Sequence, residues 1–189
     1  TIFTTDGGYI GYGAMDGVGG IHEQREAREV KLGQYGHSNQ PAHHIPYMYL
    51  YSSRPWETQK YVRDILARCY AGSTFGQGYI GDEDNGEMSA WYVLSSIGFY
   101  PLSMGNDEFA IGSPQFEEVT VNLEGNKKLV IKANNNSREN VYVDSMYVNG
   151  EKYDKTFIKY EDLIKGGTIE FNMSSTPNKE RGLEQDSLT

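Results

Sequence analysis

The sequence changes its pattern once, near Gly105, and this change restricts the folds that the chain can adopt. Before it, apolar residues recur at helical spacing between glycine-rich loops. After it, short runs alternate apolar and polar residues and are separated by Gly and Asn. We therefore expect an α+β fold, with a helical part over residues 1–104, an antiparallel β-rich part over 105–175 and a polar tail over 176–189.

The helical part contains two clear helix patterns. One follows Pro55, which suits a first helical turn, and ends before Gly72. Its apolar residues recur at i, i+3, i+4 and i+7: Val62, Ile65, Leu66 and Cys69. The other runs from about Glu87 to Ile97. An apolar stretch over residues 41–51 is also expected to be helical, although Pro46 interrupts it.

The β-rich part contains four runs with the alternation of half-buried strands. Gly and Asn pairs between the runs suit tight turns. We therefore expect antiparallel strands joined by short connections. The four runs are residues 117–124, 128–133, 141–150 and 168–173.

The charge balance excludes some classes of partner. Lys and Arg number 17 and Asp and Glu 26, which gives a net charge of −9 without any run of cations. Nucleic acid and anionic membrane surfaces are disfavoured as partners, because both need clustered positive charge. No apolar run approaches the roughly 18 residues of a membrane-spanning helix. Cys69 is the one cysteine, so the chain cannot form an internal disulfide. The chain begins with Thr1 and not with Met, so we expect a fragment or a processed product.

Aromatic residues and glycines gather in the first part of the chain. Of the 24 aromatic residues 16 precede Met104, as do 15 of the 22 glycines. Flat rings stack on pyranose faces and glycine lets a ligand approach the backbone, so this composition fits a sugar-binding surface. An ordinary aromatic core is the other interpretation, and composition alone favours it.

The densest polar cluster places four carboxylates within six residues at the start of the second helix. We name this segment, GDEDNGE over residues 81–87, the acidic loop. Like charges this close need a cation, a helix N-terminus or solvent. If the loop is extended, Asp82 and Asp84 point the same way and could share a proton, activate a water or hold a hard cation. An acidic helix cap is the alternative, and spacing does not separate the two.

A second cluster, HSNQPAHH over residues 37–44, combines imidazoles with side-chain amides. Adjacent His43 and His44 lack the i, i+4 spacing of a helical zinc pair. The carbonyl oxygens of Asn39 and Gln40 suit calcium better than imidazole does. For each histidine, a hydrogen-bonded position in the core is the more common role.

A third cluster is the pair His22 and Glu23, which follows two glycines. The pair could hydrogen-bond sugar hydroxyls. It could also belong to a salt-bridge network on a helix surface with Arg25 and Arg28, and taken alone it favours that network.

Two long phrases in this order resemble a known family. The first is HSNQPAHHIPYMYLYSSRPWETQKYVRDIL, and the second is GYIGDEDNGEMSAWYVLSSIGFYPL. Together they resemble the C-terminal part of the calcium-dependent exo-acting α-mannosidases of glycoside hydrolase family 92. The resemblance covers about residues 1–180, and phrases of this length are far more specific than a lone glycine motif.

This resemblance implies a longer enzyme, with an N-terminal β-sandwich and an (α/α)6 catalytic barrel. The chain would supply the final barrel helices and the C-terminal β segment. The implied reaction is hydrolysis of a terminal α-mannose with inversion. Asp84 is then the expected base and Asp82 its partner. Asn39 and Gln40 match the calcium loop, and Asp84 is a further expected ligand.

The resemblance also implies a leaving-group subsite and a missing acid. His22 and Glu23 match the pair that marks α-1,2-specific members. Many relatives have Glu where this chain has Gln40, so one charge is absent from the expected ion loop. The general acid of the family lies upstream of the aligned residues, so we expect this polypeptide alone to be inactive.

Family habit implies a mannose-containing glycan as substrate and a secreted, periplasmic or cell-surface location. A non-catalytic carbohydrate-binding module is the alternative function, because aromatic residues and a β-rich half suit such modules. A barrel cut into a few helices also exposes apolar faces. We therefore expect the missing N-terminal part, or a second copy of the chain, to cover Tyr47, Trp56 or Trp91.

Overall fold

The fold is known from a computed structural model that divides into two compact units. The first unit comprises Thr1–His44 and Ile65–Tyr92, and the second comprises Ile45–Asp64 and Val93–Thr189. Each unit is described by itself. The structure describes residues 2–4, 26–27, 29–70, 72, 78–103 and 105–183.

Helix α2 (Trp56–Cys69) follows Pro55, as the sequence predicts. The four apolar residues that recur at helical spacing are each at most 1% exposed. Their stripe is therefore the buried face of the helix. Of the polar residues between them, Arg68 is exposed, whereas Arg63 is partly buried and donates to Oδ1 of Asn136 (2.7 Å).

Helix α3 (Glu87–Ile97) also has its predicted bounds. It ends at Gly98, whose φ of 104° lies in a region that L side chains rarely adopt. The stretch over residues 41–51 differs from prediction, since it forms two 3₁₀-helices, η1 (Gln40–Ala42) and η2 (Ile45–Tyr51). Pro41 and Pro46 lack the amide hydrogen that a continuous α-helix would use, which accounts for the broken winding.

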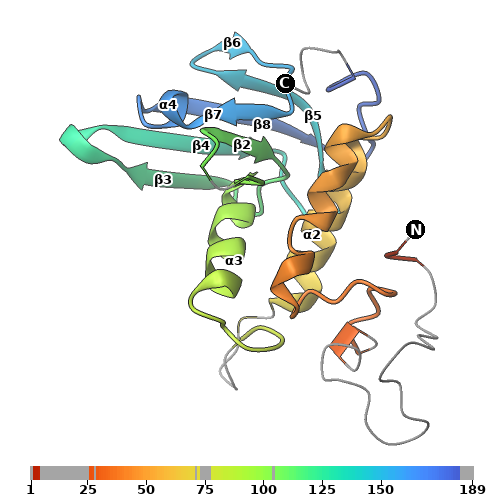
Figure 1. The fold of residues 1–189 in the computed structure, drawn as a ribbon. Helices are drawn as coiled ribbons and strands as arrows, with labels where there is room; N and C mark the ends of the chain where they lie inside the picture. Colours follow the sequence, from red (N-terminus) through yellow and green to blue (C-terminus); the bar gives the residue numbers. More distant parts are fainter. Residues whose placement is uncertain are drawn as a thin grey trace, which may run out of the picture. The chain divides into compact units, whose positions relative to one another are not determined.

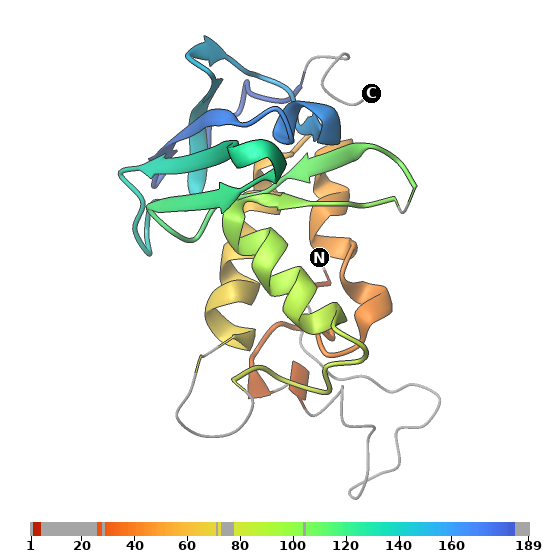
Figure 2. The ribbon, with the colours of Figure 1, turned by 90° about the vertical axis from the view of Figure 1, so that its left-hand side faces the viewer.

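The second unit contains a five-stranded sheet in the order β3-β4-β8-β5-β6. The four predicted strand runs all form strands of this sheet. Figures 1 and 2 show them from two directions. The strands are β3 (Glu118–Asn122), β4 (Lys128–Asn134), β5 (Tyr142–Val148), β6 (Glu151–Lys152) and β8 (Gly167–Ser174).

The expectation of purely antiparallel pairing is wrong at one position, because β4 and β8 are parallel. Strands β8 and β5 are antiparallel. It follows that β4 and β5 run in opposite directions, so a strand placed between them must be parallel to one of them. The last strand in the chain takes this central position, which makes the sheet mixed.

A second sheet has three strands in the order β1-β2-β7, all antiparallel. None of the three was predicted, because runs of two to four residues carry too little alternation to be recognised. The short helix α4 (Tyr160–Leu163) directly follows β7. The strands are β1 (Phe99–Tyr100), β2 (Glu108–Ile111) and β7 (Phe157–Lys159).

The two sheets share one hydrophobic core. The buried residues of β4 and β8 alternate along each strand, as expected when one face of a sheet is covered. Phe171 of β8 is fully buried, and Phe99 of β1 and Ile158 of β7 belong to the same apolar cluster. The second unit is therefore held together mainly by apolar burial between its sheets.

Part of the predicted polar tail packs on the second unit. Arg181 is 8% exposed, and its Nη2 donates to the carbonyl of Lys155 (3.0 Å). The same nitrogen lies 3.5 Å from Sδ of Met146. Residues 176–183 therefore lie against the protein surface.

The expectation that a partner covers Tyr47 and Trp91 is wrong, because both are fully buried within the chain. The hydroxyl of Tyr47 lies 2.8 Å from Oγ of Ser95, and its ring stacks on Tyr100. The indole N–H of Trp91 donates to the carbonyl of His43 (3.2 Å). Across the described part of the chain, no helix is both long and apolar enough to span a membrane.

Candidate functional site

The acidic loop turns sharply before helix α3. Asp84 and Asn85 have φ of 47° and 61°, and Gly86 follows with 94°. Asp and Asn tolerate the left-handed region better than other non-glycine residues. The condition of an extended loop is thus not met at Asp84, and strand-like alternation does not determine where the side chains of Asp82 and Asp84 point.

One carboxylate of the loop caps helix α3. Oε1 of Glu83 accepts from the amide of Ser89 (2.9 Å), and Oε2 accepts from the Ser89 hydroxyl (2.7 Å). Hydrogen bonds from Tyr79 and then from Ser89 hold the pKa of Glu83 below its ordinary value. Glu83 therefore fulfils the helix-cap interpretation of the cluster.

The other two carboxylates before the helix are available to a ligand. Asp82 and Asp84 are both exposed. Within the described residues, neither side chain makes a hydrogen bond or ion pair with another residue. Glu83 thus takes the role of the cap, whereas the functional role of Asp82 with Asp84 stays a prediction.

The amide-bearing segment lies next to the acidic loop. Nε2 of Gln40 donates to the backbone carbonyl of Asp82 at 3.4 Å. The backbone of Gly81 approaches Ser38 so closely that a Cβ at position 81 would meet Cβ of Ser38. Asn39, between these contacts, is exposed. Two segments about forty residues apart in sequence therefore meet at Gln40 and the backbone of Asp82.

The donors in this region are hard oxygen atoms. Asn39 and Gln40 carry amide oxygens, and Asp84 carries a carboxylate; this is the donor chemistry that calcium prefers. Among the described residues, no group of three or more His, Cys, Asp or Glu could hold a metal ion.

The histidines have the structural role expected for them. His37 and His43 are 0% and 2% exposed, and both ring nitrogens of each have partners. Burial, with a further contribution from His43, lowers the pKa of His37 well below its usual value. His44 is exposed. Neither His37 nor His43 has a nitrogen left for a metal.

His22 and Glu23 lie outside the described residues, so the predicted leaving-group subsite stays a prediction. The structure adds Tyr70, Glu87 and Trp91, which contact the two histidines. Sequence reasoning gave these three no functional role. Glu87 lay in the acidic cluster, whereas Tyr70 and Trp91 carried no signal that separates them from ordinary core aromatics.

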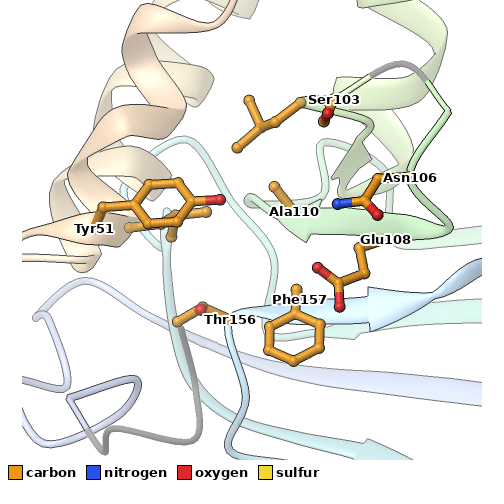
Figure 3. Close-up of a pocket in the computed structure, with 9 residues that line it drawn as sticks. Tyr51, Ser103, Asn106, Glu108, Ala110, Thr156 and Phe157 are labelled. Atoms are coloured by element: carbon orange, nitrogen blue, oxygen red, sulfur yellow. The ribbon is translucent and has the colours of Figure 1, made fainter. Parts of the chain in front are cut away.

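The second unit has a small pocket of about 50 Å³, shown in Figure 3. Its polar lining includes Tyr51, Asn106 and Glu108. Glu108 is the one carboxylate among the lining residues, and none of the predicted site residues lines the pocket. The pocket therefore lacks the paired carboxylates that the predicted chemistry needs.

A family model described as the glycosyl hydrolase family 92 catalytic domain matches residues 15–175. A curated relative, an uncharacterized secreted glycosidase of Arthroderma benhamiae, is 28% identical over 138 residues. That match covers 71% of this chain and 18% of the relative.

Two solved structures from Bacteroides thetaiotaomicron are similar over most of the chain. One is a family GH92 α-mannosidase, with 39% identity and a TM-score of 0.80 over 85% of this chain and 21% of its own. The other is a family GH92 inverting mannosidase, with 37% identity and a TM-score of 0.78 over 95% of this chain and 24% of its own. This chain spans only about a fifth to a quarter of the length of these relatives.

Proposed function

Because the chain belongs to glycosyl hydrolase family 92, we propose that it is part of an enzyme that hydrolyses α-mannosides. The observation that carries this proposal is the match to the family's catalytic domain over residues 15–175. Solved relatives at 37–39% identity support it, since both are described as mannosidases. A terminal mannose of a glycan is the proposed substrate.

Asp84 is the proposed catalytic base, with Asp82 as its partner. An inverting glycosidase needs a carboxylate that removes a proton from water on one face of the sugar. Asp82 and Asp84 suit this role because both are exposed on a turn before α3, while Glu83 holds the helix cap. Inversion is itself part of the proposal, and it is supported by the relative described as an inverting mannosidase.

Calcium is the proposed cofactor, held by Asn39, Gln40 and Asp84. Oxygen donors of these types fit calcium. The hydrogen bond from Gln40 to Asp82 links the amide segment to the acidic loop and uses the Nε2 side of the Gln40 amide, so the oxygen remains to accept or ligate. A bound calcium ion would supply positive charge beside the hydroxyls of the mannose.

His22 and Glu23 are proposed to contact the sugar on the leaving-group side, which would make the cleaved bond α-1,2. The general acid is proposed to come from another part of the enzyme, together with the remaining helices of an (α/α)6 barrel. General acid catalysis typically contributes about 10²–10⁴-fold. We therefore propose that this polypeptide alone does not release mannose. An extracellular, periplasmic or cell-surface location is proposed, and the Arthroderma benhamiae relative described as secreted supports an extracellular one.

The test is mannose release by the full-length enzyme that contains this chain. The expected result is release from α-1,2-mannobiose in the presence of calcium and loss of release after chelation, with recovery when calcium is restored. The α-1,3 and α-1,6 isomers report the linkage preference, and proton NMR of the first product reports its anomeric form. Absence of hydrolysis from every α-mannoside would overturn the proposal.

A further inference from the structure

The first unit contains a buried cluster of rings. Both histidines of the cluster are at most 2% exposed, and the indole that contacts them is fully buried. We name it the imidazole cluster and define it by Tyr35, His37, His43, Tyr70, Glu87 and Trp91.

The hydrogen bonds of His37 have a defined direction. The hydroxyl of Tyr70 donates to the carbonyl of Met88 (3.1 Å), so its oxygen accepts from Nε2–H of His37 (2.7 Å). Nδ1 of His37 then accepts from the Tyr35 hydroxyl (2.8 Å). His37 is therefore a neutral ring that connects Tyr35 to Tyr70 and, through Tyr70, to the backbone of helix α3.

His43 forms a second connection to the same helix. Its Nε2 donates to the carbonyl of His37 (2.9 Å), and its Nδ1 lies 3.1 Å from Oε1 of Glu87. Both ring nitrogens of His43 therefore have oxygen partners. The rings of His37 and His43 stack with centroids 4.5 Å apart. The carbonyl of His43 also accepts from Trp91.

These contacts join the two segments of the proposed site, residues 37–44 and the acidic loop with the start of α3. His37 and His43 flank Asn39 and Gln40 in sequence, while Glu87 begins α3 immediately after the acidic loop. The segments also meet through the hydrogen bond from Gln40 to the backbone carbonyl of Asp82, which at 3.4 Å is long and therefore weak. The shorter, buried bonds of the cluster are better suited to fix the distance between the segments.

We infer that the imidazole cluster positions the Asn39–Gln40 segment against the acidic loop, with Tyr70 and Glu87 as positioning residues. This inference rests on the proposed function for what the two segments do. A displacement of about 1 Å in a catalytic geometry can reduce the rate about 100-fold. Loss of either connection should therefore change the geometry of the site.

The first test is Tyr70→Phe in the full-length enzyme, because phenylalanine keeps the ring that stacks on Trp91 and removes only the hydroxyl. Tyr153→Phe is the matched control, since the Tyr153 hydroxyl also donates to a backbone carbonyl, that of Phe157 (2.8 Å). We expect Tyr70→Phe to lower kcat by roughly 10- to 100-fold and to weaken calcium binding in isothermal titration. The control should leave both quantities near wild type.

The second test uses Glu87→Ala and Glu87→Gln, with Glu57→Ala as the matched control. Glu57 also stands in the first turn of a helix, α2, and pairs with Arg54 and Lys60. Glutamine keeps an oxygen that accepts from His43. We therefore expect Glu87→Gln to retain more of the kcat and of the calcium binding than Glu87→Ala. Equal effects of the glutamine and alanine variants would contradict a positioning role through the His43 contact.

Hydrogen exchange measured by mass spectrometry separates this inference from the proposed function. In Tyr70→Phe and Glu87→Ala, peptides covering residues 36–44 and 80–89 should exchange faster, while peptides from strands β4 and β8 should not change. If the wild-type enzyme hydrolyses no mannoside, the proposed function fails, yet the exchange result still tests the coupling of the two segments. Unchanged exchange in both segments would overturn the inference.

Discussion

At the residue scale, the four carboxylates of the acidic loop have different surroundings. Glu83 accepts two hydrogen bonds from Ser89, and Glu87 pairs with the buried His43. Asp82 and Asp84 remain exposed. The helix cap, the contact with His43 and solvent thus give the four like charges different surroundings, and two of the carboxylates remain exposed.

The capping role of Glu83 predicts a measurable titration. Hydrogen bonds from Tyr79 and Ser89 lower the folded pKa of Glu83 below its unfolded value. Its contribution to stability is therefore present above the unfolded pKa and is lost as the pH falls through the folded pKa. Carbon NMR of the Glu83 carboxyl should give a midpoint below that of an ordinary glutamate, and Ser89→Ala should raise it. An unchanged midpoint in Ser89→Ala would contradict the capping role.

The different roles of these carboxylates could be predicted from sequence only in part. The spacing indicated an acidic helix start, and the family resemblance selected Asp82 and Asp84. The Glu83 cap and the Glu87–His43 pair depend on which side chains approach from residues 37–44 and from Ser89. Such contacts are tertiary and leave no local pattern, which is why the cap and the pair were not assigned.

At the element scale, the helices with long periodic patterns were predicted close to their observed bounds, whereas short strands were missed. Helix α2 repeats its apolar spacing over 14 residues, while β1 and β6 have two residues each. The parallel pairing of β4 with β8 was also unpredicted, because strand order depends on the path of the chain and not on alternation within a run.

The close approach of Gly81 to Ser38 predicts that one added methyl group at position 81 lowers the free energy of unfolding. Gly81→Ala would place Cβ against Ser38, at a φ of 73° that also disfavours a side chain. Gly72→Ala is the control, since Gly72 has a φ of 53° and open space around its Cβ position. In urea unfolding, Gly81→Ala should lower the free energy of unfolding by about 1–3 kcal/mol more than the control, as overpacking does. Equal losses would show that the two segments are not in tight contact.

At the scale of the whole molecule, the C-terminal segment is fixed to the second unit by a buried charge. Burial lowers the pKa of Arg181 to about 10, so the guanidinium stays charged at neutral pH. Its Nε has no hydrogen-bond partner among the described residues. Charges buried in this way are often replaced by apolar side chains without loss of stability.

Two substitutions of Arg181 should therefore have different effects on unfolding. Arg181→Met keeps most of the buried volume and removes the desolvated charge, so it should change the free energy of unfolding by less than about 1 kcal/mol. Arg181→Ala also leaves a cavity and should destabilise by about 2–4 kcal/mol. Urea denaturation monitored by circular dichroism measures both. A methionine variant as unstable as the alanine variant would indicate that the charge itself is required.

The most direct test of the central claim is the turnover of Asp84→Asn in the full-length enzyme, with Asp107→Asn as an exposed control of the same chemistry. Asparagine is nearly isosteric but cannot accept a proton from water. The predicted result is a loss of kcat of at least about 100-fold on α-1,2-mannobiose with an unchanged circular dichroism spectrum, while the control retains wild-type turnover. Turnover near wild type in Asp84→Asn would contradict the assignment of the base to the acidic loop.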